Sequence, residues 1–149
     1  LYTPATTSTK SAPCLVFIHG GAWQAGSRTD FRAQALHFAS KGYVCTTVSY
    51  RLAPAATYPG ALEDVEAALQ WLGDKTGVYQ INTNSIAIVG ASAGGHLAML
   101  AGYRDKSTQA DSVQIKAIIN LYGPSNLTTE NAKKSPAVVQ FLGKPYESA

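Results

Sequence analysis

The sequence predicts an α/β protein, with a mostly parallel sheet that carries helices on both faces. Short continuous apolar runs alternate along the chain with segments in which apolar residues recur at helical spacing. Such runs are typical of parallel strands covered on both faces. The connections between the segments are short, and there is no internal repeat or linker, which favours a single domain.

The first half contains two strong strand signals with a helix between them. Residues 1–4 resemble the tail of a strand, and the apolar run at residues 14–18 predicts the next one. A helix is expected to begin after Asp30, a plausible N-cap, and to stop at Lys41-Gly42. Residues 43–50 predict another strand because they are rich in β-branched and aromatic residues.

The second half continues the alternation. Residues 51–59 contain two prolines and predict a loop, whereas residues 61–72 carry one apolar stripe at helical spacing and predict a helix closed by Gly73. The remaining expected elements are a strand at 85–89, a small-residue helix at 96–102, a strand at 115–121 and a weaker helix at 135–142.

Composition excludes several functions. Twelve Lys and Arg against nine Asp and Glu give a net charge of +3, and these charges are scattered rather than gathered in a basic stripe. We therefore expect no nucleic-acid partner. No apolar run approaches the roughly 18 residues of a membrane span. Cys14 and Cys45 lie in apolar runs without CxxC or Cys/His clustering, which predicts buried hydrophobes and no metal site.

The most specific motif is Gly90-Ala91-Ser92-Ala93-Gly94, a G-x-S-x-G pattern between a predicted strand and a predicted helix. In a nucleophile elbow the serine occupies a strained turn that lifts its hydroxyl above the sheet, and the flanking glycines avoid collisions. The alternatives are a plain glycine-rich turn and a dinucleotide site. A dinucleotide site requires G-x-G-x-x-G, and Ser92 occupies its middle glycine position.

A second motif, His19-Gly20-Gly21-Ala22-Trp23, follows the first strong strand. Glycines at that place allow backbone N–H groups to point at a developing oxyanion, and the elbow adds the N–H of Ala93. Each such donor contributes on the order of 3 kcal/mol to stabilising the transition state of acyl transfer. Together the two motifs predict a serine hydrolase.

These motifs resemble the hormone-sensitive-lipase-like branch of the α/β-hydrolase esterases, and within it the acetyl-xylan and feruloyl esterase relatives. The resemblance extends to Tyr50-Arg51-Leu52-Ala53-Pro54, Tyr58-Pro59-Gly60-Ala61-Leu62-Glu63-Asp64 and Gly95-His96-Leu97-Ala98. It implies a three-layer α/β-hydrolase fold, incomplete at its C-terminal side. It also implies an oxyanion hole formed by the N–H groups of Gly21, Ala22 and Ala93, with Gly20 completing the turn and His19 supporting the loop.

The expected triad is incomplete in this chain. In α/β hydrolases the order is serine, acid, histidine, and no histidine follows His96. We therefore expect residues 1–149 to form a partial domain, with the acid and histidine segments absent, and the start at Leu1 suggests a processed or excised piece. His96 is a poor substitute base because the elbow turns the serine hydroxyl away from the following helix. Packing and hydrogen bonding beneath the elbow are its expected role, and His37 is expected to be solvated.

Other residues support these motifs. Arg51 is expected to pair with Asp64 or Glu63 and pin its loop to the next helix, or to form a nearly neutral exposed pair. The aromatic residues Trp23, Tyr50 and Tyr58 are expected either to line a substrate pocket or to belong to the core.

The sequence therefore predicts a serine carboxylic-ester hydrolase that acts through an acyl-enzyme on small short-acyl or aryl esters, without a metal or organic cofactor. Two alternatives remain open. The chain is a non-catalytic fragment that self-associates, or pairs with a complementing chain, through an uncovered sheet edge; or the enzyme is an arylformamidase-like amide hydrolase. Cytoplasmic and processed secreted locations both remain open.

Overall fold

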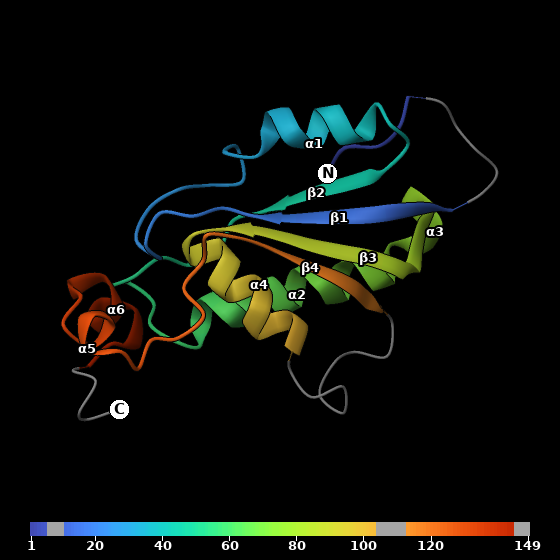
Figure 1. Cartoon of the computed structure of the whole chain (residues 1–149). Coiled ribbons are helices and arrows are strands. Elements are labelled where there is room, and N and C mark those ends of the chain that lie inside the picture. Colours follow the sequence, from blue (N-terminus) through green and yellow to red (C-terminus); the bar gives the residue numbers. More distant parts are fainter. Residues whose placement is uncertain (6–10, 104–112, 145–149) are drawn as a thin grey trace.

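A computed structural model describes residues 1–5, 11–103 and 113–144. In this part of the chain four parallel strands form one sheet in the order β2-β1-β3-β4 (Figure 1). The strands are β1 (Ala12–Ile18), β2 (Val44–Val48), β3 (Ile81–Ala91) and β4 (Ile115–Leu121). The helices are α1 (Arg32–Ala39), α2 (Gly60–Asp74), α3 (Thr76–Tyr79), α4 (Ala93–Tyr103), α5 (Glu130–Lys133) and α6 (Pro136–Leu142).

Helices cover both faces of the sheet, as the continuous apolar runs predict. In β1, Leu15 and Phe17 point to the face covered by α1, where they pack with Ala35. Cys14, Val16 and Ile18 alternate to the opposite face, in the larger core formed with α2, α4 and α6. Figure 1 shows α1 on one side of the sheet and α2 and α4 on the other.

Element ends differ from the predicted ones in several places. Strand β3 begins at Ile81 rather than residue 85, because β1 pairs with it from Ala12 onward. Helix α2 continues past Gly73 to Asp74. Asp30 is not the N-cap of α1; that position is Phe31, and Asp30 instead accepts a hydrogen bond from the Ser27 N–H at 3.3 Å.

Two short helices lie outside the helices and strands that the sequence predicts. Helix α3 follows α2 directly, and α5 is capped by the Thr129 hydroxyl, which accepts from the Ala132 N–H at 3.3 Å. Each has four residues, too few to show an apolar period in the sequence. Residues 1–4 contribute one antiparallel bridge, between Tyr2 and Cys45.

Strand β4 differs from the central strands in its exposure. It is an edge strand of the described sheet, and Ile119 and Leu121 are 44% and 37% exposed, whereas β1 is almost wholly buried. Tyr122, just beyond it, is 82% exposed. Within the described ranges, no helix has the length and apolarity that crossing a membrane requires.

Candidate active site

Ser92 forms the sharp turn between β3 and α4. Its φ of 52° lies in the left-handed region, which costs a non-glycine residue about 1–2 kcal/mol. The turn is held by backbone hydrogen bonds: the Ser92 N–H donates to the Leu121 carbonyl at 2.9 Å, and the Ser92 carbonyl accepts from the His96 N–H at 3.1 Å. A strained serine between a strand and a helix is the geometry that a nucleophile elbow requires.

The glycines on either side of Ser92 have no room for a side chain. A Cβ on Gly90 would collide with the Gly94 carbonyl oxygen, and a Cβ on Gly94 would collide with the carbonyl oxygens of Ile18 and His19. The elbow therefore packs directly on the carboxyl end of β1. This is the place where the His-Gly-Gly motif begins.

The segment after β1 adopts an unusual backbone conformation. Gly21, Ala22 and Trp23 have φ values of 102°, 53° and 60°, three consecutive residues in the left-handed region. The Gly21 carbonyl accepts N–H bonds from Gln24 at 2.9 Å and Ala25 at 3.0 Å, which closes the turn. We call residues 20–25 the oxyanion segment, after the role that the sequence predicts for them.

The oxyanion segment lies against the elbow. A Cβ placed on Gly20 would be 3.0 Å from the Ala91 carbonyl oxygen and 3.3 Å from the Ser92 Cβ. Among the described residues, the backbone N–H groups of Gly21, Ala22 and Ala93 have no hydrogen-bond acceptor. Ala93 is also the first residue of α4, where the helix dipole favours negative charge. Donors without an acceptor thus occur in the segment that packs against Ser92 and at the residue that follows Ser92.

His19 packs against this segment and stabilises it. Its side chain is 1% exposed, its Nδ1–H donates to the Gly20 carbonyl at 2.7 Å, and its ring stacks on Tyr50 with centroids 4.3 Å apart. The Tyr50 hydroxyl donates to the His19 carbonyl at 3.1 Å, and burial raises the pKa of Tyr50. Tyr50 is therefore a core residue rather than a pocket residue.

His96 lies one turn after Ser92 on α4 and is 8% exposed. Its ring packs edge-to-face against the rings of Trp23 and Phe141, with centroids 5.4 and 5.6 Å apart. Within the described structure its Nδ1 has no hydrogen-bond partner. Burial lowers the pKa of His96 to about 4, so the imidazole is neutral at pH 7. No hydrogen bond joins the side chains of His96 and Ser92 in the described ranges.

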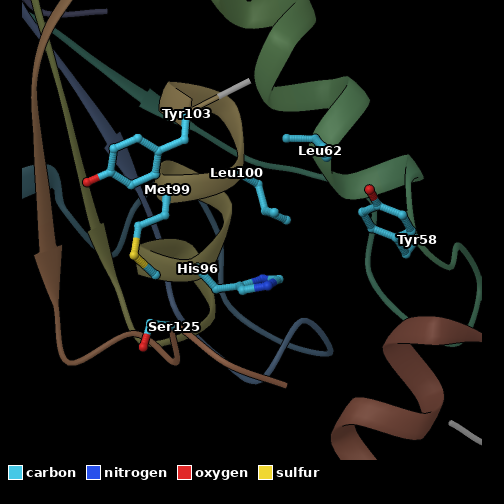
Figure 2. Close-up of a pocket in the computed structure, with 7 residues that line it drawn as sticks. All are labelled: Tyr58, Leu62, His96, Met99, Leu100, Tyr103 and Ser125. Carbon is cyan, nitrogen blue, oxygen red and sulfur yellow. The ribbon is translucent and has the colours of Figure 1, made fainter. Parts of the chain in front are cut away.

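Trp23 is also a core residue, 4% exposed and stacked on Phe141 with centroids 4.6 Å apart. Of the three candidate pocket aromatics, Tyr58 alone reaches the cavity of about 480 Å³ beside α4. Figure 2 shows the imidazole of His96 directed from α4 toward the side on which Tyr58 lies. The lining residues are Tyr58, Leu62, His96, Met99, Leu100, Tyr103 and Ser125.

Sequence reasoning missed most of this lining. The sequence places Met99 and Leu100 only within the predicted helix at 96–102, Tyr103 follows that range, and Ser125 lies in a segment without a motif. The signal that could have found them is the four-residue spacing from His96 to Leu100, which places both on one face of α4. Ser92 is not among the lining residues.

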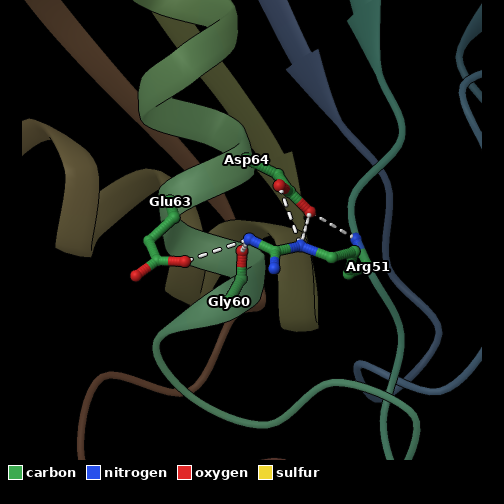
Figure 3. Close-up of polar contacts among 4 residues, drawn as sticks. All are labelled: Arg51, Gly60, Glu63 and Asp64. Carbon is green, nitrogen blue, oxygen red and sulfur yellow. Dashed lines mark hydrogen bonds and ion pairs between the residues drawn. The ribbon is translucent and has the colours of Figure 1, made fainter.

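Arg51 contacts both candidate partners (Figure 3). Its Nε donates to the two Asp64 carboxylate oxygens at 2.9 and 3.0 Å, and one terminal nitrogen donates to Glu63 at 3.0 Å and to the Gly60 carbonyl at 3.1 Å. The loop is thus pinned to the first turn of α2.

The remaining candidate groups are structural or exposed. Cys14 and Cys45 are free and buried, and burial raises their pKa values to about 12 and about 11, so neither is a reactive thiolate. His37 is exposed on α1. In the part of the chain that the structure describes, no His, Cys, Asp and Glu side chains group into a metal-binding cluster.

The parallel sheet, its covering helices and its serine turn place the chain in the α/β-hydrolase class. The structure is similar to bacterial heroin esterase, with a TM-score of 0.80 and 26% identity over 98% of this chain and 49% of that one. It is also similar to the Est2 esterase of Thermogutta terrifontis bound to butyrate, with a TM-score of 0.76 and 26% identity over 97% of this chain and 57% of that one.

The BD-FAE family model matches residues 1–149, and the chain belongs to that family. Esterase LipC of Mycobacterium tuberculosis is 33% identical over 90% of this chain and 35% of its own length. The probable carboxylic ester hydrolase LipM of the same organism is 33% identical over 93% of this chain and 34% of its own length. The hormone-sensitive-lipase-like resemblance is confirmed, and the chain spans about a third of the length of these two curated relatives.

Because His96 is buried and neutral, we predict that the folded chain loses stability at acid pH. Its pKa is about 4 when folded and near 6.5 when unfolded, so the unfolded chain binds the proton more readily between these values. This stabilisation is complete above pH 6.5 and is lost as the pH falls toward 4, by about 3 kcal/mol at most.

Urea denaturation at pH 7 and pH 4.5 measures the loss. We expect His96→Asn to reduce the difference between the two pH values, whereas His37→Asn, at an exposed position, should leave it unchanged. An equal pH dependence of the free energy of unfolding in wild type and His96→Asn would contradict the lowered pKa of His96.

Proposed function

We propose that the full-length protein is a serine carboxylic-ester hydrolase that acts through an acyl-enzyme on small short-acyl or aryl esters. The observation that carries this proposal is the placement of the oxyanion segment against the Ser92 elbow, with three backbone N–H groups free. The names of the relatives support ester hydrolysis, and a solved form of Esterase B from Lactobacillus rhamnosis, 29% identical, is described as inhibited by a tributyrin phosphonate.

The proposed chemistry follows from these positions. The Ser92 hydroxyl attacks the ester carbonyl, and the oxyanion of the tetrahedral intermediate accepts hydrogen bonds from the N–H groups of Gly21, Ala22 and Ala93. The intermediate collapses as the alcohol leaves with a proton, and water then hydrolyses the acyl-serine. Gly20 completes the turn that presents these donors.

The proton transfers require a general base. No side-chain hydrogen bond to Ser92 from a histidine is present in the described ranges, and His96 is held in an aromatic cluster. We propose that the acid and the base come from segments later than residue 149, since the α/β-hydrolase order places both after the serine.

A fluorophosphonate probe tests the nucleophile in the full-length protein. We expect one covalent adduct, located at Ser92 by peptide mass spectrometry, and no adduct in Ser92→Ala. A labelled residue other than Ser92, or no labelling of a folded and soluble protein, would overturn the proposal.

The residues 1–149 chain alone is proposed to be inactive or very weakly active, and to associate through the sheet edge at β4. The exposed side chains of Ile119 and Leu121 on this edge strand support the association. Sedimentation of this chain should show species larger than a monomer, and an Ile119→Lys variant should shift them toward the monomer. A compact monomer at high concentration would contradict the association.

The site itself does not separate ester from amide hydrolysis, since both pass through the same oxyanion. A direct comparison of p-nitrophenyl acetate with an N-formyl arylamine on the full-length protein decides between them. We expect the ester to be turned over faster, and the reverse preference would favour the amide hydrolase.

A further inference from the structure

A neighbouring loop holds the oxyanion segment through a backbone hydrogen bond. The Ala53 N–H donates to the Trp23 carbonyl at 2.8 Å, and Ala53 is buried at this contact. Because Ala22 and Trp23 both have left-handed backbone angles, their conformation persists only where surrounding contacts enforce it. The hydrogen bond from Ala53 is one such contact.

The loop that carries Ala53 is itself anchored two residues earlier. The backbone N–H of Arg51 donates to the Asp64 carboxylate at 2.7 Å, and the Arg51 Nε contacts the same carboxylate. Asp64 lies in α2, next to the fully buried Val65 of the core. Figure 3 shows the guanidinium lying along the first turn of this helix, between Asp64 and Glu63. A rigid helix thus holds Arg51 by both its backbone and its side chain.

The exposure of the pair argues that its role is not mainly global stability. The side chains of Arg51 and Asp64 are 55% and 27% exposed, and exposed ion pairs contribute little to the free energy of unfolding. Their geometry is nevertheless specific, because one carboxylate receives three hydrogen bonds and one guanidinium reaches three acceptor groups.

We propose that Arg51 and Asp64 are positioning residues that hold the oxyanion segment in its left-handed conformation through the hydrogen bond from Ala53 to Trp23. The role in catalysis rests on the proposed function of the oxyanion segment. In the described structure the hydrogen bonds and ion pairs of Arg51 and Asp64 do not include Ser92. Both act by restricting where the N–H groups of Gly21 and Ala22 point.

Trp23 reports on this segment directly, without any need for activity. Residues 1–149 contain two tryptophans, and Trp71→Phe leaves Trp23 as the only one in this chain. In that background Asp64→Ala should increase acrylamide quenching of Trp23 by about twofold, because the segment opens locally. Glu130→Gln, which removes the carboxylate of an exposed ion pair with Lys133, serves as the matched control and should leave the quenching unchanged.

Activity in the full-length protein gives a second readout. Arg51→Lys keeps the charge but loses the branched donors, and it should lower kcat for p-nitrophenyl acetate by about tenfold with KM within about twofold. Arg51→Ala should lower kcat further. A merely structural role would instead lower the amount of folded enzyme and leave kcat per folded molecule unchanged.

The two readouts separate the claims. Trp23 quenching that stays at the wild-type level in Asp64→Ala, or in Arg51→Lys if Asp64→Ala does not fold, overturns the positioning proposal. A kcat per folded molecule that stays at the wild-type value in Arg51→Lys also overturns the positioning proposal. If the wild-type full-length protein hydrolyses no ester, the proposed function fails, and the quenching experiment alone decides whether Arg51 and Asp64 hold the segment.

Discussion

Replacing Ser92 with alanine is expected to lower kcat for p-nitrophenyl acetate in the full-length protein by about 10⁵-fold or more. The loss is large because alanine has no hydroxyl to form the acyl-enzyme, while the free N–H groups beside it still bind the substrate carbonyl. KM should change little. The far-ultraviolet circular dichroism and the melting temperature should stay close to wild type, because Ser92 donates no side-chain hydrogen bond within the described ranges.

Ser40→Ala is the matched control for this experiment. Ser40 is an exposed serine at the end of α1, where its hydroxyl donates to the His37 carbonyl at 2.7 Å. We expect full activity from this variant. Removal of a serine that is not the nucleophile would leave kcat within about tenfold of wild type. A Ser92→Ala enzyme that retains about a tenth or more of the wild-type kcat would therefore show that another group attacks the ester.

The second large effect is expected at Gly94, where alanine should destabilise the fold by about 4 kcal/mol or more. The added Cβ would meet the backbone carbonyl oxygens of Ile18 and His19, and its distance to the Ile18 carbonyl carbon would be 2.7 Å. Backbone at the end of a central strand cannot turn aside as a flexible side chain can. Helix α4 must then move away from β1, which also displaces the serine turn.

Gly77→Ala provides the comparison for Gly94→Ala. Gly77 lies in the short helix α3, and nothing stands within 4 Å of a Cβ built there. Alanine at Gly77 should be neutral or stabilising by about 0.5 kcal/mol. Urea denaturation monitored by circular dichroism measures both variants. Similar stabilities for Gly94→Ala and Gly77→Ala would contradict the packing described at the elbow.

Much of the fold was predictable because its signals are local. The apolar run at β1 alternates its side chains between two covered faces, and such a run is enough to predict a buried parallel strand. The G-x-S-x-G pattern predicts a tight strand-to-helix turn because only glycine fits where Gly90 and Gly94 meet backbone atoms. Four-residue helices such as α3 leave no comparable signal.

The details of the site depend on contacts between distant parts of the chain. Whether Trp23 and Tyr50 line a cavity or belong to the core is decided by their partners Phe141 and His19, which no spacing reveals. The hydrogen bond from Ala53 to Trp23 is likewise long-range. Tyr58 reaches the cavity beside α4, and the sequence offered no way to separate it from the other two aromatics.

The most direct measurement is a crystal structure of the full-length protein after reaction with a phosphonate ester. We predict that phosphorus is bonded to the Ser92 Oγ, and that a phosphonyl oxygen lies about 2.7–3.1 Å from the backbone nitrogens of Gly21, Ala22 and Ala93, the range for oxyanion donors. A phosphonyl oxygen directed away from the oxyanion segment, or phosphorus bonded to another residue, would contradict the assignment of Ser92 and its neighbouring N–H groups.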